Sequence, residues 1–156
     1  MAGFTNRGKL RVLEMVFRQE YAGGSLPTNL YIALCTVDNV PDADTNTLAD
    51  LTQIATGNGY TDGGYQLSFG ATDFDVQNEV DASDYSYIQI KDVVWTASGG
   101  ELPSSGNGAR YAVLTDDNGT VANREVLTYW DLTSARSVSD GQSLTLQNCE
   151  LRLTET

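Results

Sequence analysis

The first strong pattern along the chain is an amphipathic stretch near the N-terminus. Apolar residues recur there at spacings of three and four, at Leu10, Leu13, Phe17 and Tyr21. This spacing predicts an α-helix over residues 9–22, which Thr5 or Asn6 caps and the glycines at 23–24 end. We expect the helix to pack this stripe on the sheet of its own domain, whereas the arm at residues 1–8 that precedes it could dock on a neighbouring chain.

After Pro27 the pattern changes to that of β-strands. Residues 29–36 form a nearly continuous apolar run, which predicts a central strand buried on both faces. Breaks in the alternation at Lys91-Asp92 and at Asn148 indicate bulges or bends. Further strands are predicted over residues 65–69, 85–96, 110–115, 125–132 and 143–153.

These short strands and their Gly-rich polar loops predict a mainly β fold. The expected architecture is an antiparallel β-sandwich or jelly-roll-like barrel with one N-terminal α-helix. The 156 residues have the length of one domain and contain no repeat or interior linker. We therefore expect a single domain, 1–156, with an arm at 1–8, the helix at 9–22 and the sandwich at 28–156.

Two connecting segments have a character of their own. Apolar residues spaced by three predict a short helix over residues 46–54. The stretch 73–84 holds five carboxylates and is expected to be exposed and mobile.

Charge and composition exclude several classes of function. Nine Lys and Arg residues stand against 21 Asp and Glu, a net charge of −12 that suits phosphate backbones poorly, so we expect no direct nucleic-acid binding. The chain has no histidine, which excludes Ser-His-Asp and Cys-His catalysis and the commoner zinc sites.

No run approaches the roughly 20 apolar residues of a membrane span. The N-terminal residues lack the apolar core of a signal peptide. Cys35 and Cys149 are expected to be buried free thiols, as in a chain made in a reducing cytosol.

Three segments partly match the patterns of phosphate-binding or metal-binding sites, but each is better explained as an ordinary loop or solvated surface. Residues 57–64 are Gly-rich but lack the Lys-Ser/Thr of a phosphate loop, and the carboxylates of 73–84 are typical of a solvated face. A third segment has the spacing that opens an EF-hand calcium loop: Asp42, Asp44, Asn46 and Asp50. Thr47 stands where that loop needs glycine and Gln53 where it needs glutamate, so a loop with local Asx turns is predicted. We expect no metal, no cofactor and no enzymatic activity.

Seven short motifs stand along the chain: NRGK at 6–9, LYIAL at 30–34, DTNTL at 44–48, GNGY and GGY within 57–65, DVVWTA at 92–97 and ARYAVL at 109–114. Together they resemble the small virion proteins of tailed bacteriophages, over about residues 5–155. Members of that group serve as capsid decoration (cement) proteins, head fibres or minor tail proteins. The resemblance thus implies that the chain belongs to a phage particle, but it does not choose between these positions on the particle.

Charge helps to choose the place, because a net charge of −12 disfavours contact with packaged DNA and favours the outer surface. We expect a decoration protein on the outer capsid surface of the virion, made in the bacterial host cytoplasm, with the major capsid protein and copies of itself (a homotrimer) as partners. The alternative is a neck, tail or head-fibre-associated virion protein. A third reading is a carbohydrate-binding module or carboxylate-dependent hydrolase, which would use Trp95, Trp130 or Tyr65.

Candidate contact residues come from the arm and helix start, from the loop 38–50 and from tyrosines beside glycines. They are Phe4, Arg7, Lys9, Asp42, Asp44, Asn46, Tyr60 and Tyr65. Trp95 and Trp130 are expected in the core, with a subunit interface as the alternative. Deleting residues 1–8 is expected to abolish capsid binding and to leave the domain folded.

Overall fold

The computed structural model describes residues 2–21 and 25–154, and its largest sheet has five antiparallel strands in the order β1-β8-β7-β2-β3. Their bounds are Ala2–Phe4 for β1, Val126–Arg136 for β8, Ala109–Thr115 for β7, Asn29–Cys35 for β2 and Tyr65–Ser68 for β3. The central position predicted for β2 is confirmed, because β2 lies between β7 and β3 and its residues 32–35 are fully buried.

A second layer consists of a three-stranded sheet, β10-β5-β4, and a two-stranded sheet, β6-β9. Their strands are β4 (Val76–Val80), β5 (Tyr85–Ile90), β6 (Val93–Thr96), β9 (Ser143–Leu146) and β10 (Cys149–Thr154). The strand β6 pairs antiparallel with β9. The same two stretches of chain pair again, beyond a short interruption, as β5 with β10, where Ile90 lies opposite Cys149. The interruption falls at residues 91–92 and 147–148, where the sequence indicates bends.

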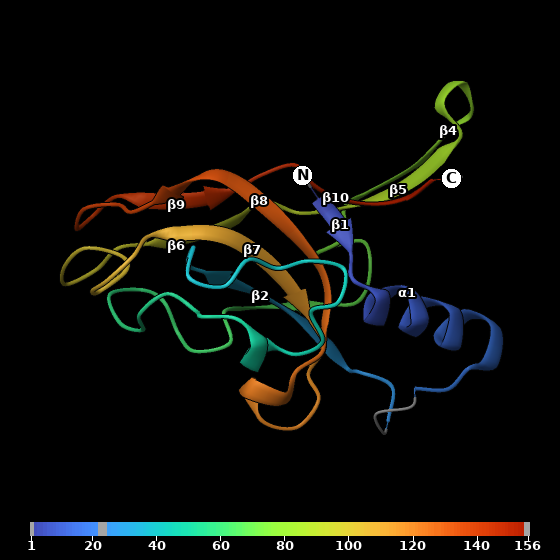
Figure 1. Ribbon diagram of the computed structural model, residues 1–156. Coiled ribbons are helices and arrows are strands. Elements are labelled where there is room, and N and C mark those ends of the chain that lie inside the picture. The colour runs from blue at the N-terminus through green and yellow to red at the C-terminus, as the bar shows by residue number, and fades with distance from the viewer. Residues whose placement is uncertain (1, 22–24, 155–156) are drawn as a thin grey trace.

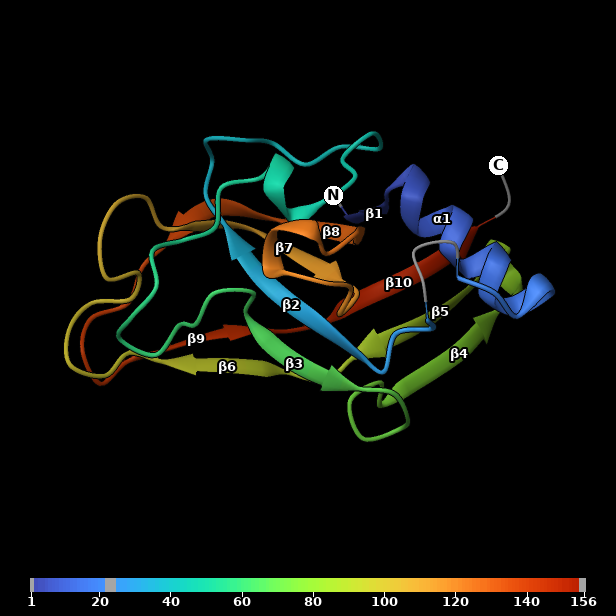
Figure 2. The same ribbon diagram turned by 90° about the horizontal axis from the view of Figure 1, so that it is seen from below.

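The main core lies between the two layers, which Figure 2 shows one above the other. Leu34, Leu114 and Trp130 of the large sheet pack there with Trp95 and Leu144 of the second layer. The opposite face of the large sheet has a smaller core under the connection between β2 and β3. Both faces of β2 and β7 are therefore covered, which explains their nearly continuous apolar sequences.

The prediction of a mainly β fold with one N-terminal helix is confirmed, and the antiparallel sheets have a sandwich-like arrangement. The described strands do not close into a barrel. Two strands were not predicted: β1 lies within the supposed arm, and β4 lies within the stretch 73–84. The helix predicted at 46–54 is a single 3₁₀ turn, Leu48–Asp50.

The N-terminal helix begins earlier than predicted. It comprises α1 (Asn6–Leu13) and a π-helical turn (Glu14–Arg18), which together we call the helical segment. Thr5 is its N-cap, as predicted, whereas the predicted glycine cap at 23–24 lies outside the described residues. The helical segment and the β4–β5 hairpin extend from the same end of the molecule (Figure 1).

Candidate interaction surface

The helical segment is anchored to the large sheet at its first turn. The Thr5 hydroxyl accepts a hydrogen bond from the Gly8 N–H at 2.8 Å and donates one to the Val126 carbonyl at 2.5 Å. Gly8 packs directly on the backbone of Leu127, where a Cβ atom would overlap the carbonyl group. These contacts fix the place and the direction in which α1 leaves the sheet.

A buried ion network attaches the following turn. Arg11 is only 2% exposed, and its Nε and Nη2 atoms donate to the two carboxylate oxygens of Glu125 at 2.5 and 2.7 Å. Its Nη1 atom donates to the Glu14 carboxylate at 2.5 Å. The planar guanidinium matches the Glu125 carboxylate with two parallel bonds, the strongest geometry for such a pair.

Tyr21 and Asp116 extend this network. The Tyr21 ring lies under the Arg11 guanidinium, with 4.7 Å from Cζ to the ring centre, and its hydroxyl donates to Asp116 at 2.6 Å. Burial and the bond to Asp116 raise the pKa of Tyr21, so the hydroxyl stays protonated. Burial also raises the pKa of Asp116, although its carboxylate accepts from Tyr21 and from the Glu125 N–H. The helical segment is thus attached largely through polar contacts.

This polar attachment turns the apolar stripe of the helical segment away from the sheet. Leu10 is 46% exposed, Leu13 is 54% exposed and Phe17 is 77% exposed. For Leu10, Leu13 and Phe17 the expectation that the stripe packs on its own domain is wrong, because Arg11 and Glu14 occupy the buried side. Tyr21, the fourth residue of the predicted stripe, is buried as expected. We call Leu10, Leu13 and Phe17 the outer helix face. Clustered exposed apolar side chains of this kind mark interaction sites.

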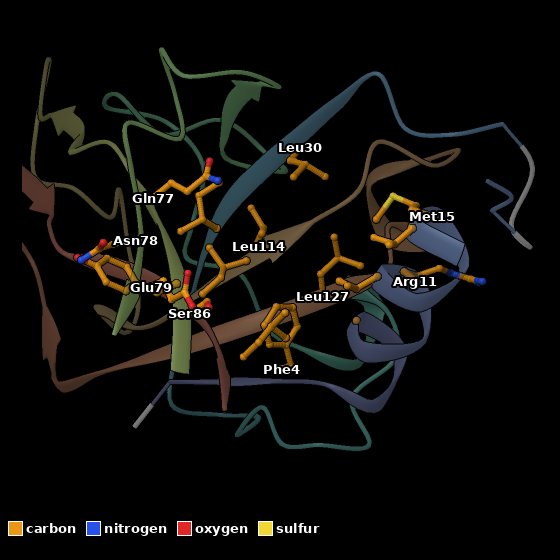
Figure 3. Close-up of a pocket in the computed structure, with 17 residues that line it drawn as sticks. Phe4, Arg11, Met15, Leu30, Gln77, Asn78, Glu79, Ser86, Leu114 and Leu127 are labelled. Carbon is orange, nitrogen blue, oxygen red and sulfur yellow. The ribbon is translucent and has the colours of Figure 1, made fainter. Parts of the chain in front are cut away.

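An apolar groove of about 860 Å³ lies beside the helical segment. Figure 3 shows it between the helix, which bears Met15 and Arg11, and the strands that bear Gln77, Asn78, Glu79 and Ser86. Strands of the large sheet contribute Phe4, Leu30, Leu114 and Leu127. The wall formed by β5 and β10 includes Tyr87, Leu151 and Leu153. The groove and the outer helix face lie at the same end of the molecule and share one helix.

The candidate residues of the supposed arm lie in or near this end. Residues 2–4 are paired with β8 of the same domain, with Phe4 opposite Thr128, so the prediction of an arm over 1–8 is corrected. Phe4 is half-buried and lines the groove. Arg7 is half-buried and donates to the Asn46 side chain at 3.3 Å, while Lys9 is exposed.

The structure brings the candidate loop residues to the start of the same helix. The Asn6 N–H donates to the Ala43 carbonyl at 2.7 Å, and the Asn6 side-chain amide donates to the Asp44 carboxylate at 2.9 Å. Asp42 accepts from the Asp44 N–H at 2.9 Å, which confirms the predicted Asx turn. Asp42, Asp44 and Asn46 are exposed, so they form one continuous surface with the helix start.

The two candidate tyrosines lie elsewhere. Tyr60 is 2% exposed, and its hydroxyl accepts from the Leu34 N–H at 3.0 Å and donates to the Gln53 side chain at 2.9 Å. The interface prediction for Tyr60 is therefore wrong, since a core residue offers no surface to a partner. Tyr65 is half-buried and packs edge-to-face on Trp95, with 6.4 Å between ring centres.

The remaining reactive groups have structural partners or are buried. Cys35 and Cys149 are free, buried thiols, as predicted, and burial raises the pKa of each to about 12. Asp73 pairs with Lys91 at 2.5 Å, and the bond holds the pKa of Asp73 below its usual range. Within residues 2–21 and 25–154, no three His, Cys, Asp or Glu side chains are grouped so that they could hold a metal ion.

Three residues that build this end of the molecule escaped the sequence reasoning: Arg11, Glu125 and Asp116. Glu125 lies 114 positions after Arg11, so no local pattern joins them. The available signal is weak: Glu125 directly precedes the apolar part of a predicted strand, where a buried carboxylate needs a partner.

No protein family, curated protein or solved structure matches this chain. None of the helices in the described part of the chain has the length and apolar character to span a membrane.

Proposed function

We propose that this chain is a structural protein of a tailed bacteriophage particle that binds the outer capsid surface as a decoration protein. Its partners in this proposal are the major capsid protein and copies of itself. The resemblance in the sequence motifs supports the kind of particle, and the net charge of −12 favours a surface away from packaged DNA.

The observation that carries the proposal is the apolar surface at one end of the molecule. The groove and the outer helix face place large apolar side chains in solvent, whereas a monomeric protein seldom leaves a large contiguous apolar area uncovered. A decoration protein has such surfaces because it gains its stability on the shell. Many modest contacts, made only with the mature lattice, stabilise that lattice by mass action.

A neck, tail or head-fibre-associated protein is the second candidate, because the same apolar surface would serve docking there. The carbohydrate-binding reading loses two of its three candidate rings. Trp95 and Trp130 are buried in the main core and offer no exposed ring on which a sugar could stack.

Copy number in purified particles tests the proposal. Quantitative mass spectrometry against the major capsid protein should give about one copy for every three capsid subunits or more, as shell symmetry demands. A count of roughly 3 to 12 copies per particle would contradict a place on the shell and favour the neck or tail.

A binding test needs point variants and not the deletion of residues 1–8. That deletion would remove the strand β1, the N-cap Thr5 and the glycine at position 8, all of which the fold uses. Loss of binding after that deletion would report misfolding. Asp44→Lys on the exposed loop is a milder change and should lower occupancy on particles. Asp140→Lys, in an exposed turn after β8, is the matched control and should bind as the unmodified chain does.

A further inference from the structure

The Tyr21 hydroxyl lies between two carboxylates that belong to the large sheet. It is 2.6 Å from Oδ2 of Asp116, in the loop after β7, and 3.3 Å from Oε2 of Glu125, which directly precedes β8. A phenol donates one hydrogen bond and can accept another in return. While both carboxylates are ionised, the single proton of Tyr21 is directed at the nearer oxygen, that of Asp116, and the contact with Glu125 stays long.

The two carboxylates differ in the charges that face them. Glu125 accepts two hydrogen bonds from Arg11 and has Arg7 at 3.6 Å. Asp116 is fully buried, and none of the ion pairs formed within residues 2–21 and 25–154 includes it. Its Oδ1 atom accepts from the backbone N–H groups of Glu125 and Asn118, at 2.8 and 3.3 Å. Asp116 is therefore a buried charge with neutral donors around it, which is costly to keep ionised.

The rest of the cluster adds negative charge. Glu14 shares Arg11 with Glu125, so three carboxylates surround one buried arginine and the half-buried Arg7. Burial raises the pKa of Asp116, and the like charge of Glu125 raises it further. Asp116 is thus the carboxylate of this cluster that gains most from a proton.

We propose that Asp116 and Tyr21 form a pH-sensitive switch that holds the helical segment more tightly in acid. A proton from solvent binds Oδ2 of Asp116, and the new O–H group donates to the Tyr21 oxygen. The Tyr21 hydroxyl then donates to Oε2 of Glu125, the oxygen that also accepts from Arg11. The protonated state has one more hydrogen bond across the contact between helix and sheet, and one buried charge fewer.

The direction of the pH dependence follows from linkage. The pKa of Asp116 is higher in the folded chain than in the unfolded chain, so the folded chain binds the proton more strongly. Stability should therefore rise as the pH falls through the folded pKa toward the unfolded value of about 4. This inference goes beyond the proposed function and does not depend on it, because it concerns the purified chain and not its copy number on particles.

Urea unfolding between pH 8 and pH 4.5 tests the switch by comparing the unmodified chain with Asp116→Asn. The asparagine amide resembles the protonated carboxyl group, since its oxygen can accept the two backbone N–H groups and its NH₂ group can donate to Tyr21. The remaining carboxylates titrate in both chains and cancel in the comparison. As the pH falls, the folding equilibrium constant of the unmodified chain should rise at least about threefold relative to that of Asp116→Asn.

Asp117→Asn is the matched control, one position along the chain. The Asp117 carboxylate accepts from the Thr28 hydroxyl at 2.7 Å and from the Asn29 N–H at 3.0 Å. Burial opposes the shift, but these bonds hold the pKa of Asp117 below its usual range. Its contribution is lost only below the unfolded pKa of about 4, so the difference from the unmodified chain should stay nearly constant from pH 8 to pH 4.5.

Hydrogen exchange shows whether the proton acts on the helical segment. After correction for the intrinsic pH dependence of exchange, the amides of residues 6–18 should be at least about threefold better protected at pH 4.5 than at pH 8. Asp116→Asn should show the higher protection at both values. Tyr21→Phe keeps the ring under Arg11 but has no hydroxyl to join the two carboxylates, so its protection should not change with pH.

The side-chain carboxyl carbon of Asp116 in the unmodified chain, followed by NMR, gives a measurement that needs no variant. It should titrate at a higher pH than that of Asp117. The reverse order would overturn the inference. So would an equal pH dependence of folding in the unmodified chain and Asp116→Asn, or protection of residues 6–18 that changes with pH in Tyr21→Phe as it does in the unmodified chain.

Discussion

Replacing Arg11 by methionine tests how the helical segment is held to the sheet. The guanidinium is almost fully buried and makes three charge-assisted hydrogen bonds, two to Glu125 and one to Glu14. Methionine has a similar length and keeps the apolar part of the side chain, but it donates no hydrogen bond. The variant therefore leaves the Glu125 and Glu14 carboxylates without their shared cation.

The magnitude follows from the burial of the partners. Removing one member of a buried ion pair costs about 3–5 kcal/mol, because the other charge stays desolvated. The Glu125 side chain keeps 11% exposure and has Arg7 at 3.6 Å, so some compensation remains and the lower value of about 3 kcal/mol applies. For a domain of this size, that loss lowers Tm by about 6–12 °C.

Thermal and urea unfolding, followed by circular dichroism, measure the effect. Arg18→Met is the matched control, since Arg18 pairs with Glu20 on the surface, with both side chains more than half exposed. It should change the free energy of unfolding by no more than about 0.5 kcal/mol. The double variant Arg11→Met/Glu125→Met should lose less than the sum of its single variants, because it leaves fewer buried charges unpaired. A loss below about 1 kcal/mol for Arg11→Met, or one equal to that of Arg18→Met, would refute the ion network as the attachment.

Two further changes test the packing and the charges of the same fold. Gly8→Ala should destabilise the protein by about 2 kcal/mol in urea unfolding, although alanine is the better helix former, because its Cβ atom would overlap the Leu127 carbonyl. Asp73→Asn should cost about 2 kcal/mol at pH 7, where Asp73 accepts from Lys91. The pKa of Asp73 is lower in the folded state, so this contribution is fully present above the unfolded pKa of about 4 and is lost progressively as the pH falls through the lower pKa of the folded state. The stability difference between Asp73→Asn and the unmodified chain should therefore shrink as unfolding is measured from pH 7 down to pH 3. The exposed variant Asp75→Asn should match the unmodified chain throughout. A difference for Asp73→Asn that stays constant over this range would contradict the ion-pair explanation.

The strands that could be predicted are those whose burial is visible in the local sequence. The strand β2 is apolar over its whole length because both of its faces are covered, and the alternation of 85–96 changes phase where the chain passes from β5 to β6. The strand β4 was not predicted because Val76, Gln77, Asn78 and Glu79 are all exposed, so no alternation marks it. The strand β1 has only three residues, and its partner β8 is more than 120 positions away.

The candidate site was harder to predict for a physical reason. Periodicity detects an apolar face on a helix but does not show what that face meets. The buried side of this helix was decided by the pairing of Arg11 with Glu125, which only the folded chain brings together. The π-helical turn at Glu14–Arg18 also changes the angular spacing, so that positions beyond Leu13 no longer follow the 3.6-residue period.

The orientation of this helix is the point at which local pattern and overall fold disagree. This helix buries Arg11 and Glu14 and exposes Leu13 and Phe17, which is unfavourable for an isolated domain. The attraction within the buried ion pair does little more than offset the free energy of removing both charges from water. The apolar area of Leu13 and Phe17 stays in water and contributes no hydrophobic stabilisation. Natural sequences depart from local consistency chiefly where function requires it. The same polar network that attaches the helix frees its apolar face for a partner, and burial of that face on binding would supply the free energy that the monomer forgoes. A functional contact is therefore expected at this helix, whichever partner covers it.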